Sequence, residues 1–319
     1  MGADFVFVDA VARPELAALV RHDPSGALDR TGANQALAGR VWGDPVLDIS
    51  TDLSVSALSP GTAEAVAKVV EKAVGHGKAV DLVALATEVV VAGLVAHAGA
   101  PCDAAAVAAW VRDLEASYGV FDAMVPIATP AVRRRVAARD ALVDALDVPL
   151  FSLMVASARN ASMAVVASML QLAQDPDAQA QHRADLSSCA LELAGLQVAT
   201  GLHAVLAAAV QNHGHGGVWR QACRATTIDG MPIPEGALVG LTDGRTVGVG
   251  EASVRGLDES FGLGLPELRL PEVLALLGLS VMLRAGSWSV RTAPRRWTPA
   301  FLPGMGWPVG PVRVAVDGG

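Results

Sequence analysis

Apolar residues recur at helical spacing through most of the chain before residue 215. The first clear run has apolar side chains three or four positions apart, at Val66, Val69, Val70, Ala73 and Val74. This spacing gathers the apolar side chains on one face of a helix. Gly75 and Gly77 follow the run, and glycine commonly ends helices. The pattern therefore predicts an amphipathic helix that ends near Gly75.

Further helices are indicated by residues that favour helix N-termini. Asp81 and Asp103 each precede an apolar run, and Thr129 precedes a proline, which is favoured in the first turn of a helix. In the helix after Thr129 we expect one buried apolar stripe, made of Val132, Val136, Val143 and Leu146. The chain up to residue 150 is therefore predicted to be a set of helices that can pack antiparallel.

Two longer apolar segments follow. Residues 150–173 predict a long helix that ends at Gln174, Asp175 and Pro176. Residues 187–211 predict one or two helices that are apolar on nearly every side. A helix that is apolar all round is normally buried, so we expect the second segment to lie inside the core.

Strand patterns are short and lie toward the two ends of the chain. Residues 23–59 have the Gly, Asp, Ser and Pro content of a loop, and Asp229-Gly230 is a tight-turn signal between two β-capable runs. We predict short strands at 4–9, 287–291 and 312–316, and helices at 14–22 and 274–283. Together these patterns predict a mainly α fold with a small β part.

Composition and charge narrow the classes of function. Of the 319 residues 52% are hydrophobic and only 4% aromatic, so Ala, Val and Leu must build the core. The formal charge of -8 argues against nucleic acid or an anionic membrane as the main partner. We expect no signal peptide, and Glu88 and His97 interrupt the longest apolar run, 82–101, so we expect no membrane span. These features predict a cytoplasmic protein.

Cysteine and histidine positions give little sign of a metal site. Cys102, Cys189 and Cys223 are too few and too scattered for a disulfide framework or a zinc knuckle, and we expect buried thiols in a reduced compartment. His213 and His215 could bind a divalent ion, but no third ligand follows in an obvious second motif. We therefore predict no metal site.

A nucleophilic triad is also not supported by the local sequence. Asp185 and Ser187 lie near His182 and His203 in the chain, but nothing resembles the Gly-x-Ser-x-Gly turn that exposes a serine nucleophile. The basic run 133–135 is predicted to be the solvated face of its helix.

The segment 261–275, FGLGLPELRLPEVLA, resembles the haem-binding loop of the cytochrome P450 family. Its matching residues are Phe261, Gly262 and Gly264, followed by Leu274 and Ala275 at the start of the next helix. The family's His, Cys and Gly positions are occupied by Pro266, Leu268 and Leu270. A Cys thiolate holds the haem iron in this family, and a leucine side chain cannot donate to iron. The resemblance therefore implies a chain that has lost its haem and carries no cofactor.

A second match lies between the long helices and this loop. Residues 219–222 and 228–239 resemble the family's Arg-x-Ala and Gly-x-x-Ile-Pro-x-Gly-x-x-Val hairpin, and Arg220 is retained. The family's Glu-x-x-Arg ion pair falls on Ala208 and Gln211, so both charges are absent. Losing both together is expected, because one partner left alone in a core would cost about 3 to 5 kcal/mol.

The long helix at 150–173 corresponds to the family's central helix, which crosses the haem. Its oxygen-activating acid–alcohol pair is replaced by Arg159 and Asn160. The resemblance implies a truncated P450-like fold in a single domain, 1–319. It places the helical bulk at 60–211 and a small β-rich part at 220–260 and 284–316.

Three functions are compatible with these losses. Haem-less P450 homologues act as auxiliary proteins that bind and activate glycosyltransferases in deoxysugar-bearing natural-product biosynthesis, and the resemblance implies such a role, in a hetero-oligomer with the transferase. The alternative is an iron-free enzyme that uses the former haem cavity for cyclisation, dehydration or isomerisation. Its polar cavity residues would be Arg159, Asn160, Gln211 and Arg220. A third possibility is a domain that recruits true P450s to peptide-synthesising assembly lines.

Overall fold

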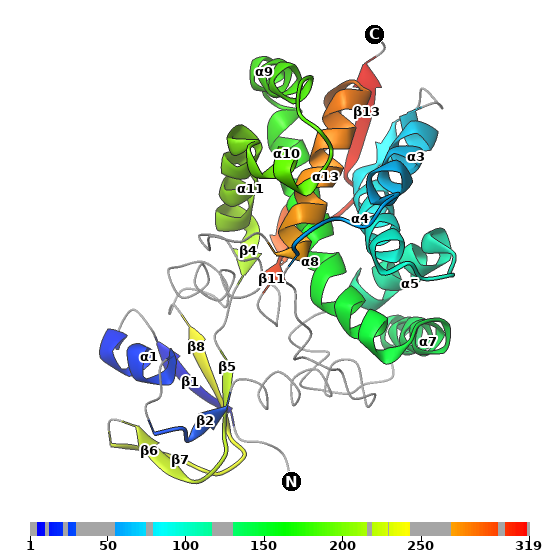
Figure 1. Ribbon diagram of the computed structural model, residues 1–319. Coiled ribbons are helices and arrows are strands. Elements are labelled where there is room, and N and C mark those ends of the chain that lie inside the picture. Colours follow the sequence, from blue (N-terminus) through cyan, green and yellow to red (C-terminus); the bar gives the residue numbers. More distant parts are fainter. Residues whose placement is uncertain are drawn as a thin grey trace.

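The computed structural model describes the residues in ten segments: 5–9, 13–21, 25–29, 55–74, 79–116, 130–215, 219–228, 230–242, 269–298 and 304–317. Most of the helices gather in one group, and a small sheet with one short helix forms a second group (Figure 1). The fold is mainly helical with several small sheets, as the sequence predicts. Most of loop 23–59 and residues 261–268 of the haem-loop match lie outside the described segments.

The long helix α8, Val148–Leu172, lies at the centre of the helical group. It packs against α4 (Leu82–Ala98), α11 (Thr200–His213) and α13 (Leu270–Ala285). The predicted helix at 150–173 is confirmed, and it begins two residues earlier because Asp147 Oδ1 accepts a hydrogen bond from Leu150 N at 2.9 Å. Helix α8 is long and apolar enough to cross a membrane, but 94% of its apolar stretch is buried in the fold, which is typical of a core helix.

Helix α13 is surrounded by other helices, and it packs mainly against α8, α3 and α4. Every residue from Leu270 to Leu283 is buried, and burying a leucine side chain contributes about 1.5 to 3 kcal/mol. Glycines permit this close packing, because a Cβ added at Gly278 would lie 2.9 Å from Val89 Cγ1 and one at Gly93 would lie 2.8 Å from Leu274 Cδ2. The prediction that this helix opens at Leu274 is corrected, since Leu270 already lies in its first turn.

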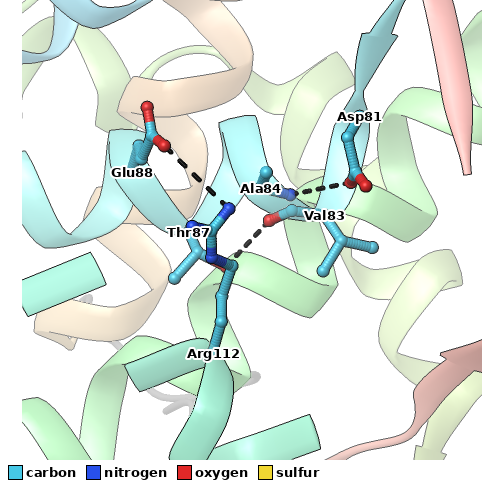
Figure 2. A network of polar contacts seen from close by, with 6 residues as sticks. All are labelled: Asp81, Val83, Ala84, Thr87, Glu88 and Arg112. Atoms are coloured by element: carbon cyan, nitrogen blue, oxygen red, sulfur yellow. Dashed lines mark hydrogen bonds and ion pairs between the residues drawn. The ribbon is translucent and has the colours of Figure 1, made fainter. Parts of the chain in front are cut away.

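Two predicted caps before α8, Asp81 and Asp103, are confirmed, whereas the predicted cap Thr129 lies outside the described residues. Asp81 Oδ1 accepts from Ala84 N at 3.0 Å at the start of α4, as Figure 2 shows. Asp103 does the same for Ala105 N at the start of α5, Ala104–Ala116. Helix α3, Thr62–Val74, ends before Gly75 as predicted. Helices α4 and α5 are also joined by an ion pair, 4.0 Å between Arg112 Nη1 and Glu88 Oε1 (Figure 2).

Helix α7, Pro130–Ala145, buries a face that is rotated by about a quarter turn from the one the sequence predicts. Val136 and Val143 are 38% and 39% exposed. The buried face is instead formed by Arg135, Ala138 and Leu142. Apolar residues occur on both faces of α7, so helical periodicity alone could not decide which face meets α5. The predicted stripe is therefore wrong, apart from Leu146, which follows the helix and is buried.

The stretch after α8 contains one helix that the sequence analysis did not predict. Helix α9, Pro176–Leu186, begins at the Asp175-Pro176 pair that ends α8. Asp175 Oδ1 accepts from Ala178 N at 3.0 Å, so this pair both ends one helix and caps the next. The apolar segment 187–211 forms two helices as expected, α10, Leu193–Gln197, and α11. The expectation that the segment is buried all round is wrong, because each helix buries one face and Val198 is 67% exposed.

The second group is a four-stranded sheet in the order β1-β8-β5-β2. These strands are Phe5–Asp9, Leu238–Thr242, Trp219–Ala222 and Leu28–Asp29. Strands β1 and β8 run parallel, and helix α1, Pro14–Arg21, packs on them. The predicted hairpin is confirmed as β6, Thr226–Ile228, and β7, Met231–Ile233, with Ile228 opposite Met231 and Gly230 at a φ of 75°.

The C-terminal strands return to the helical group. Strand β13 (Arg313–Asp317) lies between β3 (Val80–Asp81) and β9 (Ser287–Thr292) and pairs with both. Strand β10, Arg296–Thr298, pairs with β12, Trp307–Val309. Between them β11, Gly304–Met305, pairs with β4, Gly214–His215.

A buried amide joins α8, α9 and β9. The side chain of Gln179 is buried, and its Nε2 donates to Leu172 O at 3.2 Å and to Trp288 O at 3.0 Å. Its Oε1 accepts from Trp288 N at 2.6 Å. The amide therefore bonds both main-chain groups of Trp288, as a neighbouring strand would.

We predict that Gln179→Ala lowers the free energy of unfolding by about 1 to 3 kcal/mol, because Trp288 N loses its acceptor inside the core. Urea denaturation measures the change. The matched control is Gln181→Ala on the same helix, where the exposed amide bonds Asp185 at 2.8 Å and should contribute less than about 0.5 kcal/mol. Equal effects of the two variants would contradict the role given to Gln179.

Candidate functional site

The residues around the start of α13 do not provide a thiolate for haem. Leu270, at the degenerate glycine position, is buried in the first turn of α13, whereas Pro266 and Leu268 lie outside the described residues. The three cysteines lie elsewhere, after α4, after α9 and after β5. No cysteine occurs in the segment directly before α13, between residues 224 and 269, where the haem loop would need one. The donor set therefore does not fit a thiolate-bound haem.

The cysteines are also less buried than predicted. Cys102 and Cys189 are half-buried and Cys223 is exposed, so the expectation of three buried thiols is corrected. Each lies in a connection just beyond the end of a helix or strand, and connecting segments run over the surface.

Arg159 and Asn160 lie next to each other in the middle of α8, and both side chains form hydrogen bonds with the main chain of Met305. Arg159 Nε donates to Met305 O at 3.2 Å. Asn160 Oδ1 accepts from Met305 N at 2.9 Å. The two side chains are only 9% and 8% exposed, and Met305 is fully buried. Strand β11 is thus fastened to α8 at the position where the P450 resemblance implies oxygen activation.

The same strand is also attached to the end of α11. Strands β4 and β11 pair antiparallel, with Gly214 opposite Met305, and Gly306 N donates to His213 O at 2.8 Å. The His213 ring stacks on Trp297, with 4.4 Å between the ring centroids. Figure 1 shows β4 and β11 side by side next to α8. Three segments that are distant in sequence therefore converge on Met305.

His213 has the environment of a packed residue. Burial lowers its pKa below the ordinary histidine value. Among the described residues, no group of three His, Cys, Asp or Glu side chains could hold a metal ion.

The other predicted polar residues lie away from Met305. Gln211 is exposed near the end of α11, and Ala208, its partner in the lost ion-pair motif, is half-buried. Arg220 is buried on β5, opposite Val239 of β8, in the four-stranded sheet. Of the four proposed cavity residues, the structure thus brings together Arg159 and Asn160.

The residues considered for a triad have other partners. Asp185 Oδ1 accepts from Gln181, and Ser187 Oγ donates to Ala184 O at 2.7 Å. His182 packs against Gly201, where an added Cβ would lie 2.8 Å from its ring. In the basic run, the first two arginines are exposed as predicted, but Arg135 is buried.

One polar pair was missed by the sequence analysis. Glu272, in the first turn of α13, lies 3.5 Å from His203 of α11, measured from Oε1 to Nδ1. The other ring nitrogen, Nε2, lies 2.9 Å from Leu196 O. Its hydrogen bond with Glu272 raises the pKa of His203. A sequence signal did exist, because Glu272 is the only acidic residue in α13 and His203 lies inside an apolar helix.

Comparison with known proteins identifies the fold. No family model matches the sequence, and no curated protein matches it. Among solved structures, CYP175A1 from Thermus thermophilus matches with a TM-score of 0.55 and 16% identity, over 99% of this chain and 100% of that chain. Cyanobacterial CYP120A1 with bound retinoic acid matches with a TM-score of 0.58 and 14% identity, over 98% of this chain and 88% of that chain.

A third match is P450BioI in complex with an acyl carrier protein, with a TM-score of 0.56 and 14% identity, over 98% of this chain and 91% of that chain. At these identities the matches show the fold alone. The chain therefore has the cytochrome P450 fold, in agreement with the sequence resemblance.

We predict that Asn160→Ala releases β11 from α8, because Met305 N loses its acceptor in the core. The expected cost is about 1 to 3 kcal/mol, and the backbone amide of Met305 should exchange with deuterium faster than in the unmodified chain. Asn160→Asp keeps an acceptor oxygen and should keep this amide protected.

The matched control is Asn212→Ala, at an exposed position of α11. It should leave both the stability and the exchange of Met305 unchanged. If the backbone amide of Met305 exchanges at an unchanged rate in Asn160→Ala, the hydrogen bond from Met305 N to Asn160 is not needed to hold β11.

Proposed function

We propose that this chain is a haem-free protein of the cytochrome P450 fold that acts by binding a partner, a glycosyltransferase of natural-product biosynthesis. The observation that carries the proposal is the bonding of Arg159 and Asn160 to Met305, at 3.2 and 2.9 Å. In the family these positions hold an acid and an alcohol that serve oxygen chemistry. Here they bond the chain's own backbone.

The absence of a cysteine at the haem-ligand position also supports the proposal. Haem needs a thiolate before α13, and the chain has no cysteine after Cys223. A protein that binds and activates another needs only a stable fold and a complementary surface. Its effect would be to shift the conformational population of the partner.

The iron-free enzyme is less well supported by the same contacts. Arg159 Nε and Asn160 Oδ1 are already engaged by the main chain of Met305, so these two atoms could meet a substrate only after those hydrogen bonds break. Gln211, a third residue of that hypothesis, is exposed to solvent. The binding role requires no such rearrangement. It would operate in the cytoplasm as a hetero-oligomer with the transferase.

The first prediction of this proposal concerns haem. The chain, produced with a haem precursor in the medium and purified, should show no haem absorbance band. A thiolate-ligated P450 produced in parallel is the control, and it should take up haem. Stoichiometric haem in this chain would overturn the haem-free proposal.

The second prediction concerns the transferase. Affinity capture of the tagged chain from its own producing cells should recover a glycosyltransferase in stoichiometric amount. That transferase, co-expressed with the chain, should be about 5 to 150 times more active than when expressed alone, because couplings between binding events are commonly about 1 to 3 kcal/mol.

The control for the second prediction is co-expression of the transferase with a haem-binding P450, which should give no activation. A transferase that is fully active alone would contradict the auxiliary role. So would capture of the chain without a transferase.

A further inference from the structure

The imidazole of His203 lies between two hydrogen-bond acceptors on two other elements. Nδ1 faces the carboxylate of Glu272 at 3.5 Å, and Nε2 faces the main-chain oxygen of Leu196 at 2.9 Å. A neutral imidazole has one N–H and one lone pair, so it can donate to only one of these acceptors. The imidazolium donates to both. The arrangement of α10, α11 and α13 around this ring therefore fits the protonated form.

Burial of Glu272 strengthens this preference. Its side chain is only 4% exposed, and Oε2 has no hydrogen-bond partner among the described residues. A buried carboxylate without a cation carries a large desolvation cost. The positive charge of His203 offsets that cost, so the proton on the ring stabilises both members of the pair.

Other charged groups on the elements packed around His203 have different partners. On α8 the charged residue is Arg159, which bonds Met305. On α13 the second charged residue is Arg284, which bonds the main-chain oxygens of Leu186 and Cys189. On α9, His182 lies against Gly201, Asp177 is exposed, Arg183 donates to Ser287 Oγ, and Asp185 accepts from Gln181. Helix α10 has no charged residue. Glu272 is therefore the charge that acts on His203.

We propose that His203 and Glu272 form a proton-dependent latch that ties α11 and α10 to the first turn of α13. With the proton bound, the latch holds the start of α13 in place. When the proton leaves, one of the two acceptors loses its donor and Glu272 is left as a buried charge without a cation. The first turn of α13 and the α10–α11 connection then open more easily.

The position of the latch gives it a role in this fold. An ion pair built on arginine stays charged at every physiological pH, whereas one built on histidine titrates near neutrality. Because His203 of α11 is paired with Glu272 of α13, the attachment of α13 responds to cellular pH.

The direction of the pH effect follows from linkage. The pKa of His203 is raised by its hydrogen bond with Glu272, so the folded chain holds this proton at pH values where the unfolded chain has lost it. The stabilisation is complete below about pH 6.5, the unfolded value, and is lost as pH rises through the higher folded value. Each unit of raised pKa changes the folding equilibrium constant about tenfold.

The test compares the full chain with His203→Gln and Glu272→Gln by urea denaturation between about pH 5.5 and 9, a range that brackets the ordinary histidine pKa. The difference in stability between the unmodified chain and His203→Gln should fall as pH rises. Glu272→Gln should lower the pKa of His203, which an NMR titration of its ring protons measures directly.

The matched control is His97→Gln. Burial lowers the pKa of His97, so the unmodified chain should gain stability relative to this variant as pH rises through the range just below about 6.5. The two His→Gln variants should therefore change the pH dependence in opposite directions.

Hydrogen exchange provides a second readout on the unmodified chain. Amides of Val273 and Leu274 in α13, of Ala199 between α10 and α11, and of Leu202 in the first turn of α11 should exchange faster, after correction for intrinsic rates, at about pH 8.5 than at about pH 6. If a variant fails to fold, the NMR titration and this measurement on the unmodified chain decide. A His203 pKa at or below about 6.5, or protection that does not change with pH, would overturn the proposal.

Discussion

The burial of α8 and α13 is the constraint on which the other contacts depend. Both helices are apolar on nearly every side, and glycines at positions 93 and 278 allow α13 to lie close to α4 and α8. Leaving a buried polar group unsatisfied costs about 1 to 3 kcal/mol. The buried hydroxyls of Ser157, Ser162, Ser168 and Ser280 on these helices have no partner among the described residues. The larger polar side chains of the core do find partners, and through them they attach other segments to it.

Three such residues show the same principle. Asn160 bonds Met305 and holds β11, Gln179 bonds Trp288 and holds β9, and Glu272 pairs with His203 and holds α11. Two of these partners are main-chain groups of strands from the C-terminal part of the chain. The small strands have few pairing neighbours of their own, so side chains of the helices complete their hydrogen bonding. Thus the polar residues of the helical core also position the β part.

Local signals in the sequence were sufficient for most elements. Caps such as Asp81 and the turn at Gly230 depend on neighbouring residues alone, and both were predicted correctly. The buried face of α7 was not, because apolar residues lie on both of its faces and the choice between them is made by α5. Glu272 and His203 do stand out within apolar helices. Their pairing, like that of Asn160 with Met305, could not be predicted, because the members of each pair are distant in sequence and meet only through the packing of the fold.

The arrangement of the helices and strands and the identity of the residues in the middle of α8 can vary independently. The solved P450 structures and this chain share an arrangement of elements at 14 to 16% identity, so the same fold is formed by very different sequences. At the centre of α8, Arg159 and Asn160 satisfy the backbone of Met305, and a side chain engaged in this way stabilises the fold at the expense of reactivity. The proposed role in binding another protein uses the outer surface and leaves these buried hydrogen bonds intact, whereas the proposed iron-free chemistry would draw on the same two side chains.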